Sequence, residues 1–99
     1  MFYAIIAKDK ENTLYKRMVY RPQHLARIKI LQEQGKLLLA GPFPAIDSSD
    51  PGIDGFTGSL IVAEFSSIND AIIWAHEDPF YTFGVFASVD VKPFRKTLP

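Results

Sequence analysis

One short segment of the sequence, Gly58–Phe65, restricts the fold more than any other. Its centre, Leu60–Ala63, is apolar at every position, whereas a strand with one face in water alternates apolar and polar residues. We therefore expect a strand in a sheet that is covered on both faces. A chain of 99 residues can bury one apolar core but not two, so we treat residues 1–99 as a single domain.

The remaining segments predict further strands and two helical regions. Thr13–Val19 is predicted as a short helix, and Pro22, which suits the first turn of a helix, predicts a main helix from there to about Gly35. Ser67–Asp70 has the spacing of a capping box and predicts another helix, which Asp78 closes because it precedes a proline. Aromatic and β-branched residues predict strands over 2–7, 37–41 and 85–91.

This order of elements, β-α-β-β-α-β, is the ferredoxin-like arrangement of the α+β class, with a four-stranded antiparallel sheet. Right-handed crossovers place both helices on one face of that sheet. The opposite face still carries apolar side chains, and a second copy of the same sheet is the usual covering for a chain this small. The sequence therefore predicts a homodimer whose sheets pack face to face.

Composition limits the partners and the location. Eleven basic residues balance eleven acidic ones, so no excess charge attracts nucleic acid or an acidic membrane. The absence of cysteine excludes disulfides and thiolate metal sites, and the two histidines are too far apart for a metal-binding motif. We expect no metal and no cofactor. The N-terminus lacks the features of a signal peptide and no apolar run could span a membrane, so we expect a cytoplasmic protein.

His24 is the residue best placed to carry chemistry. His24, Ile28 and Leu31 share one helical face, and the apolar companions indicate that this face is buried. The two helices run antiparallel in this topology, so we expect Asp78 beside His24. A carboxylate that accepts from one imidazole nitrogen leaves the other free for proton transfer. Alternatively, His24 donates to a backbone carbonyl and has a structural role, and Asp78 only ends a helix.

Two arginines, Arg17 and Arg21, continue the helical ridge of His24 if the chain bends only mildly at Pro22. Guanidinium groups beside a histidine suit a carboxylate, phenolate or phosphate. The alternative is a solvated basic face, because no acidic residue interrupts the segment that also contains Lys16, Arg27 and Lys29. His76 lies outside the apolar stripe of its helix and is expected at the surface.

Other functional classes find less support. Residues 42–57 are rich in proline, glycine and small polar residues, which is typical of either a functional loop beside a pocket or a plain surface loop. Ser59 follows Gly58 outside the G-x-S-x-G setting of a serine nucleophile. RNA-recognition domains share this strand order but stack bases on exposed aromatic residues of the third strand, which residues 60–65 lack. We expect no nucleic-acid binding.

Blocks along nearly the whole chain resemble the YCII-related (YciI-like) family. They are Arg17, Arg21-Pro22-x-His24-Leu25-Ala26-Arg27, Ala40-Gly41-Pro42-x-Pro44-Ala45-x-Asp47, Gly55-Phe56-Thr57-Gly58-Ser59, Asp78-Pro79-Phe80, Gly84-Val85 and Val91-Lys92-Pro93-Phe94. The resemblance implies a dimeric ferredoxin-like α+β barrel, similar to muconolactone isomerase. It also implies a functional histidine and aspartate, which match His24 and Asp78, and relatives that include lyase-type enzymes acting on ring compounds.

We therefore predict a cofactor-independent enzyme of lyase or isomerase type. In this hypothesis His24 moves a proton at a carbon next to a carbonyl or phenol, and Asp78 orients it. The substrate is a small anionic or ring-containing molecule, and the residues expected to bind it are Arg17, Arg21, Gly41, Pro42 and Phe80. The alternatives are a dimeric ligand-binding or regulatory module without turnover, and a purely structural interaction domain.

Overall fold

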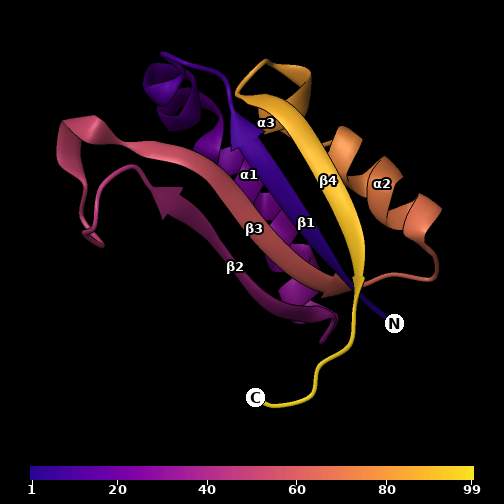
Figure 1. Cartoon of the computed structure of the whole chain (residues 1–99). Coiled ribbons are helices and arrows are strands. Elements are labelled where there is room, and N and C mark those ends of the chain that lie inside the picture. The colour runs from indigo at the N-terminus through magenta and orange to yellow at the C-terminus, as the bar shows by residue number, and fades with distance from the viewer.

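The computed structural model describes residues 1–99 and has the predicted ferredoxin-like α+β architecture (Figure 1). Its elements are β1 (Phe2–Asp9), α1 (Leu14–Glu33), β2 (Leu37–Pro44), the 3-10 helix η1 (Gly52–Asp54), β3 (Phe56–Glu64), α2 (Ile68–His76), α3 (Pro79–Thr82) and β4 (Phe86–Phe94). The strands form one antiparallel sheet in the order β2-β3-β1-β4. Figure 1 shows α1 and α2 on the same side of this sheet.

The core lies between the sheet and the helices, and its centre is strand β3. Ile61 and Ala63 of β3 pack with Ile5 of β1 against Ile28 and Leu31 of α1. The intervening Val62 points to the opposite face and is also buried. Leu60, on the same face as Val62, is only half-buried, so the sheet is covered on its helix side and the expected covering of its other face is not seen within this chain.

Helix α1 differs from the prediction, because the chain does not stop or restart at Pro22. One continuous helix runs from Leu14 to Glu33 with Pro22 inside it. Pro22 has no N–H to donate to the carbonyl of Met18, but both residues are exposed, so water can hydrate that carbonyl. His24 consequently lies in the middle of a long helix and not in a first turn.

The strands next to the predicted loop are longer than the sequence indicates. β2 continues to Pro44 and β3 begins at Phe56, so residues 45–55 make up the connection. Pro42 and Pro44 are tolerated in β2 because it is an edge strand that pairs only with β3. Similarly, β4 begins at Phe86 and continues to Phe94 past the proline at position 93.

The segment between α2 and β4 contains a short helix that the sequence analysis does not predict. The Ser67 side chain accepts from the Asp70 N–H and caps α2, as the capping-box spacing indicates. Asp78 follows α2, and its carboxylate accepts from the Phe80 N–H, which caps α3. Pro79 therefore starts α3 as well as preventing α2 from continuing. None of the helices is long and apolar enough to cross a membrane.

Candidate active site

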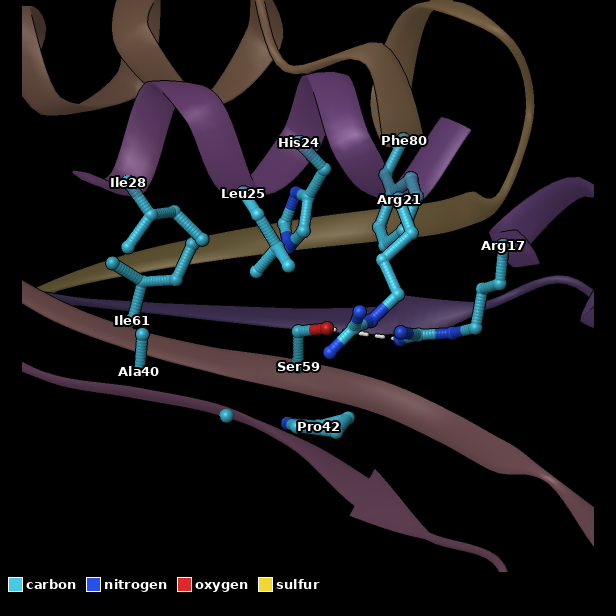
Figure 2. Close-up of a pocket in the computed structure, with 11 residues that line it drawn as sticks. Arg17, Arg21, His24, Leu25, Ile28, Ala40, Pro42, Ser59, Ile61 and Phe80 are labelled. Carbon is cyan, nitrogen blue, oxygen red and sulfur yellow. Dashed lines mark hydrogen bonds between the residues drawn. The ribbon is translucent and has the colours of Figure 1, made fainter. Parts of the chain in front are cut away.

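A cavity of about 190 Å³ lies between α1 and the two strands β2 and β3, with Phe80 of α3 on its wall (Figure 2). All the residues expected at a site line it, except Asp78, which lies behind His24. Its full lining is Arg17, Arg21, His24, Leu25, Ile28, Ala40, Gly41, Pro42, Ser59, Ile61 and Phe80. Of the predicted loop over 42–57, only Pro42 lines this cavity.

His24 and Asp78 form a buried pair in this cavity wall. Nδ1 of His24 lies 2.8 Å from Oδ2 and 2.9 Å from Oδ1 of Asp78. Only 1% of Asp78 and 6% of His24 are exposed. An ionised carboxylate can only accept hydrogen bonds, so Nδ1 carries the proton and the neutral imidazole keeps its lone pair on Nε2. The structural alternative, a hydrogen bond from His24 to a backbone carbonyl, is not what is found.

Aromatic rings hold the imidazole of His24 in place. Phe80 stacks on it with ring centroids 4.0 Å apart and an angle of 9° between the planes, and Phe86 meets it edge-on at 6.3 Å. Nε2 makes no hydrogen bond within the protein, and the ring projects from α1 toward the sheet (Figure 2). A base with a fixed orientation and a free nitrogen therefore faces the cavity.

Arg17 is buried, and its Nε and Nη2 atoms bind groups of β1 and β3. Its Nε donates to Oδ2 of Asp9 at 2.6 Å and its Nη2 to Oδ1 at 3.2 Å. Nη2 also donates to the Gly58 carbonyl at 2.8 Å and to the Ser59 hydroxyl at 2.9 Å. The expectation of a solvated basic face is therefore wrong for Arg17, whose charge is paired inside the protein.

The other basic side chains of α1 have different environments. Arg21 is exposed, forms no ion pair and lines the cavity, where Figure 2 shows its guanidinium extending toward the sheet. Arg27 is half-buried. Its Cζ lies 4.3 Å from the centroid of the Trp74 ring, and its Nη2 donates to the Trp74 carbonyl. Burial lowers the pKa of Arg27, and the nearby carboxylates of Asp78 and Glu77 act in the opposite direction. Arg21 is therefore the one unpaired cation at the cavity.

Two polar residues of this site were missed by the sequence analysis. Ser59 is 4% exposed and faces the cavity, and Asp9 anchors Arg17 from the end of β1. A signal for Ser59 was available, because it is the polar member of the buried series Ser59, Ile61 and Ala63 at alternate positions of one strand.

His76 is exposed, as predicted, and stacks on Tyr81. No cluster of three or more His, Cys, Asp or Glu side chains could hold a metal.

The fold and site define a class: ferredoxin-like α+β proteins with a histidine–carboxylate pair at a small cavity between helix and sheet. The chain belongs to the YCII-related domain family, whose model matches residues 1–95. It is 53% identical over 96 residues to protein YciI of Escherichia coli O6:H1, covering 97% of this chain and 98% of that one. An uncharacterized protein of Haemophilus influenzae is 52% identical over 96 residues, with the same coverage.

A solved structure of an enzyme has the same fold. It is the 5-chloro-2-hydroxyhydroquinone dehydrochlorinase TftG from Burkholderia phenoliruptrix AC1100, in complex with 2,5-dihydroxybenzoquinone. The two structures align with a TM-score of 0.83 and 27% sequence identity, over 96% of this chain and 94% of TftG. The likeness shows the fold and makes a small-molecule enzyme plausible.

Proposed function

We propose that this protein is a cofactor-independent lyase or isomerase that acts on a small ring compound, with His24 as the proton-transfer group. The observation that carries the proposal is the buried contact of 2.8 Å between His24 Nδ1 and Asp78, which leaves Nε2 free at a cavity. Asp78 orients the ring and stabilises the imidazolium that forms when Nε2 takes a proton.

The chemistry needs no group beyond the side chains of the cavity. Nε2 takes a proton from a carbon next to a carbonyl, and the C–H electron pair moves onto the carbonyl oxygen as an enolate; from a phenol hydroxyl it takes a proton and leaves the pair on that oxygen. In a lyase reaction the enolate pair returns and expels a leaving group, such as chloride, from an adjacent tetrahedral carbon; on a chlorinated hydroquinone the imidazolium first gives its proton to the chlorine-bearing ring carbon, which makes that carbon tetrahedral, and Nε2 then takes the proton of a second hydroxyl as chloride leaves. In an isomerase reaction the imidazolium gives the proton back to a different carbon. Both routes conserve electrons, so no oxidant is required.

The size and lining of the cavity favour a single ring with an anionic or ionisable oxygen. An apolar protein cavity of about 150 Å³ binds benzene, and this cavity has about 190 Å³. Leu25, Ile28 and Ile61 supply apolar walls, and Arg21 supplies a free positive charge. The ring compound bound to TftG, 2,5-dihydroxybenzoquinone, supports the same class of substrate here.

The direct test is turnover of hydroxylated rings by the wild-type protein. Purified protein is incubated with 5-chloro-2-hydroxyhydroquinone and with its chlorine-free analogue, and products are followed by mass spectrometry and chloride release. We expect wild type to release chloride from the chlorinated compound and to leave the mass of the chlorine-free control unchanged, His24→Asn to lose chloride release, and the exposed control His76→Asn to keep it. Asparagine at position 24 can still donate an N–H toward Asp78 but cannot act as a base.

Two other outcomes identify the alternative functions. If a ring compound raises the melting temperature and is recovered unchanged, the protein is a ligand-binding or regulatory module. If no small ring compound or carboxylate stabilises it, the cavity has no ligand of this class and an interaction domain is favoured.

We also propose a cytoplasmic location, which cell fractionation tests.

We propose in addition that two copies associate through the sheet face that the helices leave open. That face carries Ile6, Leu39, Phe43 and Phe94, which are all more than a third exposed, next to the buried Val62. Pairing two such faces would remove this apolar surface from water. Sedimentation at micromolar concentration should show a dimer, and Leu39→Lys should shift it to monomer. A wild-type protein that sediments only as monomer contradicts the proposal.

A further inference from the structure

We infer that the Ser59 hydroxyl donates a hydrogen bond to the substrate oxygen that becomes negatively charged, and that Arg17 and Asp9 are positioning residues for it. The inference rests on the proposed function and narrows its substrate class to rings whose phenol or enol oxygen ionises during the reaction. In Figure 2, Ser59 lies on the sheet side of the cavity and His24 on the helix side.

The first step of the argument is the direction of the hydroxyl proton. A serine hydroxyl has one proton to donate and lone pairs that accept. Nη2 of Arg17 donates to Oγ of Ser59 at 2.9 Å, and a guanidinium cannot accept in return. Oγ has no other hydrogen-bond partner in the protein, so its proton is left without an acceptor.

The second step is the location of that unused donor. Ser59 is 4% exposed, and it lines the cavity that Nε2 of His24 faces. A buried polar group without a partner is costly unless a ligand or water completes its hydrogen bonds. We therefore expect the free proton of Ser59 to be accepted by an atom inside the cavity. A ring compound that contacts His24 would place an oxygen there.

The third step is the rigidity and charge of the groups behind Ser59. Asp9 holds Arg17 with two hydrogen bonds, and the Gly58 carbonyl accepts a third. The guanidinium is thus fixed before any ligand binds, and its positive charge polarises the Ser59 hydroxyl, which strengthens it as a donor.

The experiment uses 4-nitrophenol as the probe, because its phenolate and its neutral form differ in visible absorption. The ratio of bound phenolate to bound phenol is measured at a pH where the free probe is mostly neutral. We expect wild type to raise this ratio above that of the free probe, and Ser59→Ala to lower it about tenfold, as expected for one hydrogen bond to a charged group. Ser49→Ala, in the exposed connection between β2 and β3, is the matched control and should equal wild type.

A second pair of variants separates the hydroxyl from side-chain shape. Ser59→Thr and Ser59→Val have nearly the same volume, and only threonine keeps a hydroxyl. We expect the threonine variant to retain the high phenolate ratio and the valine variant to lose it. The comparison stays valid if the alanine variant is too unstable to measure, because both replacements suit a β-strand.

The NMR signal of His24 distinguishes failure of this inference from failure of the proposed function. If the probe shifts the His24 signal but Ser59→Ala and Ser59→Val keep the wild-type phenolate ratio, the role of Ser59 is refuted and the proposed site stands. If neither the probe nor a hydroxylated ring shifts the His24 signal in the wild type, the proposed function is refuted and the role of Ser59 is refuted with it.

Discussion

Replacing Asp78 by asparagine would separate the structural role of this residue from its effect on His24. Oδ1 of Asp78 accepts from the Phe80 N–H at 2.8 Å, and Oδ2 lies 2.8 Å from Nδ1 of His24. In Asp78→Asn the amide oxygen can keep the bond to Phe80, which places the amide nitrogen against Nδ1. The amide nitrogen donates, so it favours a lone pair on Nδ1 and the imidazole proton on Nε2, in competition with the 2.9 Å contact between Nδ1 and the amide oxygen.

The expected magnitudes differ sharply for activity and stability. The equivalent exchange in the serine-protease triad puts histidine in the wrong tautomer and lowers kcat about 10⁴-fold, so we expect a loss of at least about 10³-fold here. Asparagine caps a helix nearly as well as aspartate does, and a neutral amide is easier to bury than a carboxylate. The free energy of unfolding should therefore change by less than about 1 kcal/mol.

Nitrogen-15 NMR of the imidazoles tests this prediction before any substrate is known. His24 should be protonated on Nδ1 in the wild type and on Nε2 in Asp78→Asn. The exposed His76 serves as the internal reference, and Asp50→Asn, in the exposed connection between β2 and β3, is the control variant. A wild-type His24 with its proton on Nε2, or a variant that keeps the proton on Nδ1, would refute the reasoning.

Three further predictions concern the groups around the cavity. Asp9→Ala leaves Arg17 buried without its carboxylate and should lower the free energy of unfolding by roughly 3–5 kcal/mol in urea denaturation. A loss no larger than that of the exposed control Asp50→Ala contradicts this. Gly58→Ala should unfold the protein or close the cavity, because an added Cβ would lie 2.1 Å from the Ala7 carbonyl oxygen. An added Cβ at Gly41 would have no atom within 4 Å, so Gly41→Ala should keep the wild-type melting temperature. Arg21→Met should weaken binding of an anionic ring several-fold at low salt and much less at high salt, without a change in melting temperature; equal weakening at both salt concentrations would argue against an electrostatic role.

The features that could be predicted from the sequence are those that depend on neighbouring residues. The apolar run Leu60–Ala63 identifies the strand at the centre of the core, and Ser67 caps α2 through a residue three positions away. The helical spacing of His24, Ile28 and Leu31 places His24 on the buried face. With the order of elements, these local patterns were enough to predict the ferredoxin-like fold and to expect Asp78 near His24.

Other features were decided by tertiary packing. Pro22 stays inside α1 because the whole helix packs on the sheet, and this packing compensates for a lost hydrogen bond whose carbonyl faces water. The unpredicted α3 forms where Asp78 can cap it and Phe80 can bury its ring against His24. Asp78 and Pro79 are local signals for the start of α3, but a helix of four residues is stable only with the packing of Phe80, so both outcomes depend on surfaces supplied by distant segments.

The same distinction applies to the candidate site. Arg17 was expected from its sequence to lie beside His24 and bind an anion, but its partners are Asp9, Gly58 and Ser59. These contacts require the antiparallel register that pairs Lys8 with Gly58, and they require α1 to cross the end of that strand pair. The amino-acid sequence alone determines which residues share a face of one helix or strand. The polar groups that meet between elements are determined only when the sheet register and the helix position are set together.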